Sequence, residues 1–414
     1  MVPSRLVTAF FLAIDSIRAH KLRSFLTLLG VIIGVSSVVL VGSAIDGLGK
    51  YAEESTSKAF GTDSYLIAQI ASAGRMTRKE FAEKLRVNKR PRQEDVDYLR
   101  ETTGESVLYT PYRNRPEDVK VNDATYEAAT IIGVSSTLPE IRDVTLTDGR
   151  FFTEEEERRK QSVAVIGDEI RTTLFPSVSP LGRSIKVRGH EFVVVGIQEK
   201  LGSAFGRSQD NSVYIPTSVF SQMYGIGSGL AIFGRARPES KLKLEDGLDL
   251  TRVALRTRFK AKPGKPDNFD TLTPDSIRSF VDSILGLIAA VVVPVTLISL
   301  VVGGIVIMNI MLVSVTERTR EIGVRKALGA KRSDIMAQFL IEASVMSAVG
   351  GLFGIAFGAL LTFILSHAFE LTLQITAPYV ILSLFVSTTV GVVSGWYPAS
   401  RAAKLDPIEA LRAD

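Results

Sequence analysis

The chain has 414 residues, of which 46% are hydrophobic and 22% are charged, and its formal net charge is +5. Long stretches carry no charge, which excludes an ordinary soluble protein and predicts an integral membrane protein. The sequence has no cysteine, which excludes cysteine-based metal sites, thiol catalysis and disulfides. The small basic excess lies beside the uncharged stretches, so no nucleic acid partner is needed to explain it.

Four uncharged runs are each long enough to cross a bilayer as a helix. They span residues 24–45, 283–316, 343–366 and 371–400. The first run is too long for a signal peptide and no convincing cleavage pattern follows it, so we expect an uncleaved anchor. The sequence therefore predicts an α-helical membrane protein with four transmembrane helices. A large mixed α+β extracytoplasmic domain is expected between helices 1 and 2.

The positive charges cluster at one set of helix ends. They are Arg5, Arg18, Lys21 and Arg23 before the first run, Arg318, Arg320, Arg325, Lys326, Lys331 and Arg332 after the second, and Arg401, Lys404 and Arg412 after the fourth. By the positive-inside rule, both termini and the charged segment between runs two and three are expected in the cytoplasm.

Nine segments are expected in chain order. They are a cytoplasmic amphipathic helix (1–23), transmembrane helix 1 (24–47), the extracytoplasmic domain (48–272), a stalk with transmembrane helix 2 (273–316), a charged cytoplasmic segment (317–334), transmembrane helix 3 (335–366), an outer loop (367–376), transmembrane helix 4 (377–400) and a cytoplasmic tail (401–414). The first helix gathers Val7, Phe10 and Ile14 on one face, which favours contact with membrane lipid in the headgroup layer.

Glycines spaced four apart occur in three of the four transmembrane segments, and this spacing lets helix backbones approach closely. They are Gly30 and Gly34 in the first, Gly350, Gly354 and Gly358 in the third, and Gly391 and Gly395 in the fourth. We expect a tightly packed bundle that includes contacts between subunits.

The second run is longer than a bilayer requires. Its 34 uncharged residues would extend about 50 Å as a helix, against a hydrocarbon core of about 30 Å. Thr273 and Pro274 form a helix-start pattern, so the helix is expected to project outward as a stalk. Pro294 interrupts it and would act either as a static kink or as a hinge.

The extracytoplasmic domain shows strand and helix signals. Strands are expected at 162–167, 184–188, 191–197 and 212–215, and a helix at 168–174. Gly189 and His190 mark a hairpin turn, and Thr153 with Glu156 forms a capping box, so the adjacent acidic run starts a helix rather than a metal site. Residues 75–92 and 260–269 are expected to be irregular. The first is strongly basic, which suits either a solvated loop or a site for anionic headgroups or a partner, and the second is a linker.

The charged segment reads ERTREIGVRKALGAKRSD. Glu321 and Arg325 stand four apart, which favours a helical ion pair, and Gly329 is placed to end the helix. The segment also contains apolar residues such as Leu328, and two interpretations of it remain. The segment is either an amphipathic docking helix at the membrane face or an ordinary inside loop.

Motifs for chemistry are missing from the sequence. No phosphate-binding glycine loop, histidine pair with metal-ligand spacing or hydrolase signature occurs. We therefore expect no enzyme activity, no metal site and no cofactor bound by this chain. Glu342 is the ionisable residue within a transmembrane segment, and its place near the helix start favours pairing with an arginine or lysine over a proton relay.

Several motifs resemble the MacB/FtsX-type ABC permeases, and the resemblance covers nearly the whole chain. They are FLTLLGVIIGVSSVV in the first run, DGRFFTEEE, VAVIGDEI, PLGRSIKVRGHEFVVVGI and DNSVYIP in the extracytoplasmic domain, ERTREIGVRKALGAKRSDI with FLIEA, and the tail YPASRAAKLDPIEALR. The resemblance implies a MacB-like core domain, an FtsX-like permease domain and the bacterial inner (cytoplasmic) membrane.

The resemblance also implies that the charged segment is a coupling helix that docks onto an ATPase. The residues this assigns are Glu317, Arg318, Arg320, Glu321, Ile322, Gly323, Arg325, Lys326, Leu328 and Gly329. A separate ABC ATPase subunit would bind ATP and Mg²⁺, and two copies of this chain would form a homodimer.

The expected outcome is efflux of small molecules or peptides, with a periplasmic adaptor protein as a further partner. Lipoprotein extraction and regulation of a cell-wall hydrolase use the same architecture and stay open. From another class, a non-transporting membrane sensor or scaffold stays open too.

Overall fold

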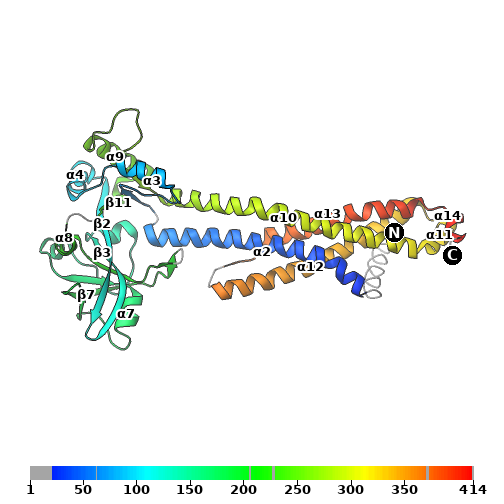
Figure 1. Ribbon diagram of the computed structural model, residues 1–414, viewed down its shortest axis with the longest axis horizontal. Coiled ribbons are helices and arrows are strands. Elements are labelled where there is room, and N and C mark those ends of the chain that lie inside the picture. Colours follow the sequence, from blue (N-terminus) through cyan, green and yellow to red (C-terminus); the bar gives the residue numbers. More distant parts are fainter. Residues whose placement is uncertain (1–20, 62, 205–206, 226–228, 370–372, 413–414) are drawn as a thin grey trace. The chain divides into compact units, whose positions relative to one another are not determined.

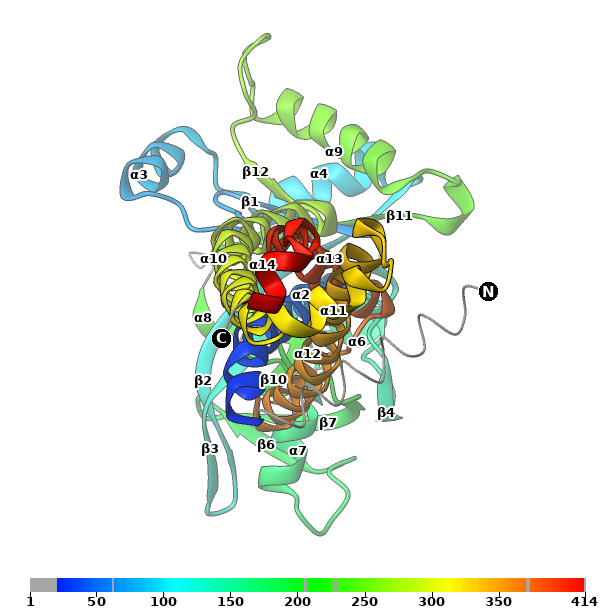
Figure 2. The same ribbon diagram turned by 90° about the vertical axis from the view of Figure 1, so that its right-hand side faces the viewer.

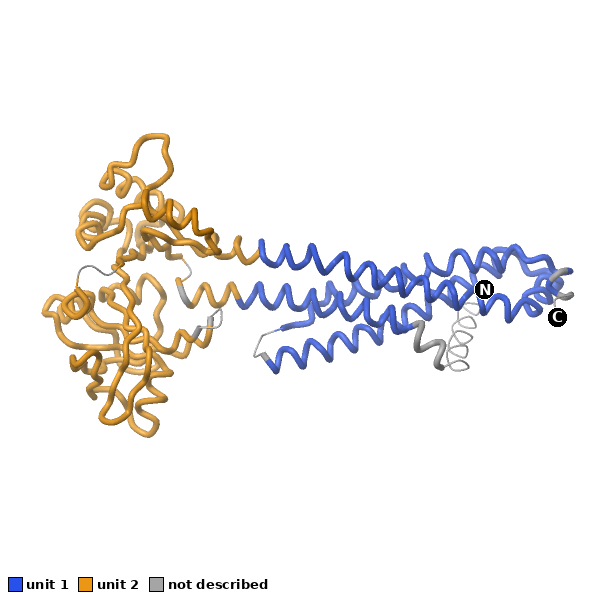
Figure 3. The backbone as a smooth tube through the Cα atoms, viewed as in Figure 1, with its two compact units in different colours: residues 1–51, 283–414 blue, residues 52–282 orange. Residues whose placement is uncertain are grey.

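The computed structural model describes residues 21–61, 63–204, 207–225, 229–369 and 373–412. The chain divides into two compact units, which Figure 3 colours separately. We call residues 1–51 and 283–414 the helical unit and residues 52–282 the α/β unit. The helix expected at residues 1–23 lies outside the described residues, except for the last three, which begin the first described helix.

The described part of the helical unit is built from four long helices and two short ones (Figure 1). The long ones are α2 (Lys21–Phe60), α10 (Pro274–Glu317), α12 (Arg332–Phe369) and α13 (Ala377–Lys404), and the short ones are α11 (Thr319–Ala327) and α14 (Pro407–Arg412). Each long helix contains a window long and apolar enough to cross a membrane. The four spans predicted from charge-free runs are thus confirmed.

Apolar side chains cover the outside of these helices as well as the inside. Leu287, Val301, Phe363 and Ile381 are each mostly exposed, which in water would be a large unfavourable surface and in lipid is not. The buried side chains form one cluster drawn from α2, α10, α11, α12 and α13. The helical unit is therefore organised like a membrane bundle, with a packed centre and a lipid-compatible surface.

Glycines fill the contacts between these helices. A methyl group on Gly30 would lie 2.7 Å from the Cα atom of Gly303, and one on Gly354 would lie 2.7 Å from the Cβ atom of Val35. Gly391 faces Ser347 in the same way, at 2.6 Å. The other glycines at this spacing also face a neighbouring helix of the same chain, and they are Gly34, Gly350, Gly358 and Gly395. Packing within one subunit therefore accounts for these glycines, and contacts between subunits stay a prediction.

The α/β unit is centred on a ten-stranded mixed sheet among the described residues. Its strands are β1 (Ser64–Ala68), β2 (Val107–Val121), β3 (Ala124–Val134), β4 (Leu146–Gly149), β5 (Val163–Ile166), β6 (Ser184–Val187), β7 (His190–Gln198), β10 (Ser212–Pro216), β11 (Ala231–Ala236) and β12 (Asp270–Leu272). The order is β12-β1-β11-β2-β3-β10-β5-β7-β4, and β6 pairs with β2 and β7. The pairs β3–β10 and β5–β7 are parallel.

Helices cover this sheet, and four of them pack in two of its buried clusters among the described residues. The helices are α3 (Arg78–Val87), α4 (Gln93–Thr103), α5 (Leu138–Arg142), α6 (Glu154–Arg158), α7 (Asp168–Leu174), α8 (Thr217–Tyr224) and α9 (Leu244–Arg258). One core joins β1, β2 and β11 to α4 and α9, and the other joins β3, β5, β7 and β10 to α7 and α8. The long strand β2 contributes side chains to both, so it connects the two halves of the unit.

Most sequence predictions for this unit are confirmed. The predicted helix at 168–174 is α7, the strands at 162–167 and 212–215 are β5 and β10, and the Thr153–Glu156 capping box is present. The predicted hairpin is β6–β7, but its turn is one residue earlier than expected. Arg188 and Gly189 have φ values of 50° and 82°, the pairing geometry of a two-residue hairpin turn, and His190 already belongs to β7.

The prediction that residues 75–92 are irregular is wrong. The segment contains α3, whose first turn is capped reciprocally by Thr77 and Glu80. This S/T-x-x-E signature was present in the sequence, but the density of basic residues obscured it. Residues 261–269 carry no helix or strand, as predicted for a linker.

Candidate functional site

Helix α11 occupies a turn between the long helices α10 and α12. Figures 1 and 2 both place it beside α14 at one end of the helical unit. It ends in a Schellman arrangement, because the Gly329 amide donates to the Lys326 carbonyl and the Ala330 amide donates to the Arg325 carbonyl. Gly329 takes φ +95°, a value that residues with a Cβ atom rarely adopt. The glycine predicted to end the helix therefore does so.

One face of α11 is fixed to the bundle by apolar packing. Ile322 is 1% exposed and belongs to the same buried cluster as Ile335 and Phe339 of α12. Gly323 beside it is also buried. Burying a side chain of this size contributes about 1.5–3 kcal/mol, so α11 is held to the bundle as well as joined to it by the chain.

Lys326 joins α11 to the end of α13. Its Nζ atom donates to the carbonyl oxygens of Ala403 and Leu405, at 2.7 and 2.6 Å. A cation suits this position because the last carbonyls of a helix are otherwise unsatisfied and carry partial negative charge. Burial lowers the pKa of Lys326, nearby Arg332 lowers it further, and Asp406 opposes them.

Arg325 joins α11 to α12. Its Nη1 atom donates to the Oε1 atom of Gln338 at 2.7 Å. The ion pair predicted between Glu321 and Arg325 is not among the salt bridges between described residues, because the arginine faces α12 while Glu321 is exposed. The four-residue spacing shows that Arg325 could reach Glu321, but packing against α12 gives Arg325 the partner Gln338 instead.

Arg318, the residue between α10 and α11, pairs with Glu342. Its Nη1 atom lies 3.3 and 3.4 Å from the two carboxylate oxygens of Glu342. Glu342 is 3% exposed, and an ionised carboxylate at this depth requires a nearby cation. The prediction that Glu342 pairs with an arginine or lysine is confirmed.

The opposite face of α11 is open. Leu328 is 84% exposed, and Val324 of α11 is also exposed. Ile408 of the adjoining α14 is exposed as well. Arg320 and Glu321 flank them with opposite charges. The sequence assigned ten residues to this site without separating the two faces, and it missed Ile408. The tail motif that carries Ile408 was used only as evidence for the family.

Among the described residues, no group of three or more His, Asp or Glu side chains could hold a metal ion. The histidines His190 and His367 lie on a strand of the α/β unit and near the end of α12. The contacts of α11 join it to α12 and to the end of α13, and its exposed face offers a binding surface.

Comparison with known families now identifies the chain. Residues 24–257 match the MacB-like periplasmic core domain, and residues 293–407 match the FtsX-like permease C-terminal domain. The chain belongs to the MacB-type permease family. The first match contains almost all of the α/β unit and the second contains α11, α12 and α13.

Two curated relatives align along nearly the full chain. The macrolide export ATP-binding/permease protein MacB of Neisseria gonorrhoeae is 36% identical over 415 residues, covering 99% of this chain and 61% of the relative. The protein of the same name from Bdellovibrio bacteriovorus is 35% identical over 407 residues, covering 96% of this chain and 60% of the relative. The chain thus spans about three-fifths of the length of the relatives it matches.

Solved structures of extracytoplasmic regions are similar to part of the chain. The periplasmic region of MacB from Actinobacillus actinomycetemcomitans has a TM-score of 0.43 at 16% identity and covers 55% of this chain and 95% of that one. The extracellular domain of the transporter YknZ from Gram-positive bacteria has a TM-score of 0.38 at 16% identity and covers 51% and 100%.

The family and the helices together establish the architecture. The permease is a multi-pass inner-membrane protein with four transmembrane helices. Its large extracytoplasmic domain, of mixed helices and strands, lies between the first and second of them.

Proposed function

We propose that this permease transmits force from a separate cytoplasmic ABC ATPase to its extracytoplasmic domain, and that α11 is the docking element. Two copies of the chain would pair with two ATPase subunits. The observation that carries the proposal is the two-faced character of α11, which is fixed to three helices on one side and open on the other.

The contacts of α11 suit a part that receives force. Arg325 links it to α12, Lys326 links it to α13, and Ile322 anchors it in the buried cluster. A displacement of α11 would therefore be passed to several transmembrane helices at once. A loop tethered only at its ends would absorb the same displacement.

The junction with α10 also favours transmission. Only Arg318 separates the two helices, and the hydroxyl group of Thr319 donates to the Val315 carbonyl across the junction. Helix α10 has 44 residues, a length of about 66 Å, which exceeds a hydrocarbon core of about 30 Å. Such a helix reaches beyond the membrane, as a lever requires. Pro294 lies inside it, and a hinge there is part of the proposal.

The exposed surface sets the chemistry of the partner. Leu328, Val324 and Ile408 present apolar groups, and Arg320 and Glu321 add one charge of each sign at the rim. A central apolar contact with a polar rim is the usual anatomy of a protein interface. We expect the ATPase to offer an apolar groove that takes Leu328.

Co-purification tests the docking role. Leu328→Asp and Val324→Asp each place a carboxylate in the proposed interface without disturbing a buried contact. We expect them to remove the ATPase from the purified complex. The control is Val253→Asp, which makes the same change at an exposed valine of α9 in the extracytoplasmic domain, and it should leave the complex intact.

Complexes that survive both α11 substitutions would contradict the proposal. Charge reversal at Arg325 or Lys326 is a weaker test, because both side chains bind within the permease and their loss would disturb its fold.

For the cargo, we propose efflux of small molecules or peptides with a periplasmic adaptor, because both curated relatives are named as macrolide export proteins. Export from proteoliposomes that contain the permease, its ATPase and the adaptor is the test. A stable complex that hydrolyses ATP without exporting any of a panel of macrolides and peptides would overturn this choice of cargo.

A further inference from the structure

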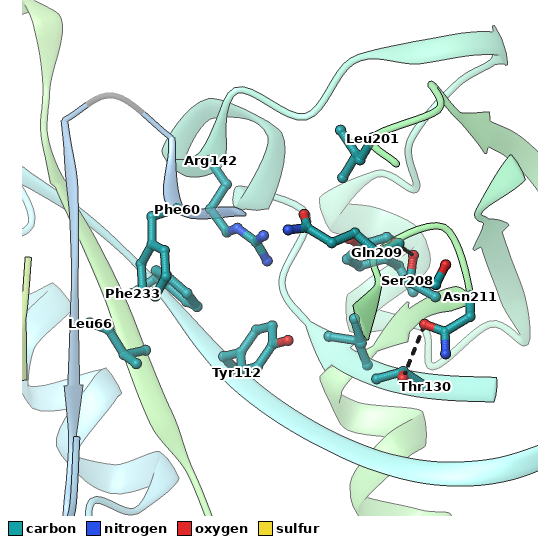
Figure 4. A pocket seen from close by; sticks show the side chains of 13 residues that line it. Phe60, Leu66, Tyr112, Thr130, Arg142, Leu201, Ser208, Gln209, Asn211 and Phe233 are labelled. Atoms are coloured by element: carbon teal, nitrogen blue, oxygen red, sulfur yellow. Dashed lines mark hydrogen bonds between the residues drawn. The ribbon is translucent and has the colours of Figure 1, made fainter. Parts of the chain in front are cut away.

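A cavity of about 280 Å³ lies inside the α/β unit, over the middle of its sheet. One wall is apolar and aromatic, with Phe60, Leu66 and Phe233 (Figure 4). The opposite wall is polar, with Ser208, Gln209 and other side chains from the segment that leads into β10. A small, mostly apolar space with a few polar groups is typical of ligand sites.

Arg142 is the cation of this cavity, and it is 9% exposed. Its guanidinium group lies over two rings, 5.2 Å from the centroid of Phe233 and 5.9 Å from that of Tyr112. Its buried Nε atom has no hydrogen-bond acceptor among the described residues. The neighbouring carboxylate, Asp143, pairs at 2.5 Å with Arg235. Stacking offsets part of the cost of burying this charge, but no salt bridge within the described part of the chain neutralises it.

The position of Arg142 is fixed by its backbone. It is the last residue of α5, and Ile141 before it is fully buried. Gly61 approaches so closely that a methyl group on it would lie 3.0 Å from the Cα atom of Arg142. Packing therefore holds the backbone of Arg142, and the two rings place its guanidinium group at the cavity.

Two further polar groups face the same space. Figure 4 shows the carboxamide of Gln209 pointing toward the guanidinium of Arg142, with the ring of Tyr112 beside them. Burial raises the pKa of Tyr112, so its hydroxyl stays protonated near neutral pH and can donate a hydrogen bond. Arg142 and Tyr112 together would present donors to one anionic group.

We propose that this cavity binds a small organic carboxylate with an apolar body. The planar guanidinium fork matches a carboxylate in a bidentate pair, and a single cation favours a single negative charge. The aromatic wall accommodates the rest of the molecule. Both a peptide carboxyl terminus and a short fatty acid have this chemistry. Binding needs neither the ATPase nor ATP, so it is independent of the docking proposal.

Isothermal titration of the full-length permease in non-ionic detergent tests the site. The probes are N-acetylphenylalanine, for a peptide terminus, and octanoate, for a fatty acid. N-acetylphenylalanine amide is the neutral control. We expect saturable binding of at least one carboxylate, at least tenfold tighter than binding of the amide. The tighter of the two carboxylates identifies the source of the ligand.

Variants place the binding at this cavity. Arg142→Met should remove the preference for the carboxylate, and Arg142→Lys should keep part of it. Gln209→Trp should fill the space while leaving the charge of Arg142 in place. The matched control is Arg188→Met, which removes another arginine that stacks on a ring, Tyr224, away from the cavity. It should bind like the wild type.

Three results would overturn the proposal. They are no saturable binding of either carboxylate to the wild type, equal affinity for the amide, and unchanged binding in both Arg142→Met and Gln209→Trp. The first would assign Arg142 a purely structural role between the two rings.

Discussion

The ammonium nitrogen of Lys326 lies 2.6 Å from the carbonyl oxygen of Leu405, so α11 is bonded to the end of a transmembrane helix 79 residues further along the chain. The same nitrogen donates to the carbonyl of Ala403. One side chain thus satisfies two acceptors that the end of α13 would leave open. Lys326 faces inward and holds α11 to the bundle. Leu328 faces outward and is free to contact a partner protein.

Replacing Lys326 with methionine should destabilise the helical unit. The change keeps most of the side-chain volume but leaves two carbonyl groups without their charged donor, at a cost of about 1–3 kcal/mol. Thermal unfolding of the detergent-solubilised permease measures it. Leu328→Asp is the comparison and should unfold like the wild type. Equal unfolding midpoints for Lys326→Met and the wild type would show that the contact contributes nothing.

The buried pair of Arg318 and Glu342 should show strong coupling. Arg318→Met removes the cation that faces a nearly buried carboxylate, a change that costs about 3–5 kcal/mol in fully buried pairs and less here because Arg318 is partly exposed. Glu342→Gln should cost less, and the double variant should be more stable than Arg318→Met alone. A double-mutant cycle of unfolding free energies is the measurement, and additive effects would argue against the pairing.

Gly303 should be sensitive to a single methyl group. A Cβ atom there would lie 3.0 Å from the backbone of Gly30 and Val31, so Gly303→Ala must push α10 away from α2, at about 1–3 kcal/mol. Gly286 lies on the same helix, and a methyl group added to it would meet nothing within 4 Å. Gly286→Ala should therefore be neutral or slightly stabilising. Similar unfolding midpoints for the two variants would contradict the close approach.

The extracytoplasmic domain should lose stability in acid through Glu156. The Arg150 guanidinium and the helix cap at Thr153 lower the pKa of Glu156 to about 2. A lowered folded-state pKa stabilises the fold above the unfolded value of about 4.3, and this contribution disappears as the pH falls toward 2. Glu156→Gln should weaken the pH dependence of the unfolding free energy between pH 5 and 2.5, measured by tyrosine fluorescence of the full-length permease, whose one tryptophan lies in α13. An unchanged profile would count against this assignment.

Prediction from sequence succeeded where the signal was local or compositional. Charge-free runs identified the four spans, and Gly329, the Thr153 cap and the β6–β7 hairpin followed from short motifs. Each of these depends on neighbours within a few residues. At residues 75–92 the local signal was present in the Thr77–Glu80 cap, but the dense basic charge favoured a loop instead.

The rest depended on contacts between distant residues. Nothing in the segment around α11 indicates that Lys326 caps a helix 79 residues away, or that Gln338 rather than Glu321 binds Arg325. The spacing of Gly30 and Gly34 indicated a close approach, but not that Gly303 is the partner. The cavity around Arg142 had no sequence signal, because its lining comes from several strands and two helix ends that lie far apart in the chain.

Site-specific labelling tests the central claim most directly. The chain contains no cysteine, so Leu328→Cys and Val253→Cys each introduce one exposed thiol. In spheroplasts treated with a membrane-impermeant maleimide, we expect Val253→Cys to react at once. Leu328→Cys should react only after permeabilisation, and should then be protected when the ATPase is bound. Labelling of Leu328→Cys in intact spheroplasts would place α11 outside the cell, where no cytoplasmic ATPase can reach it.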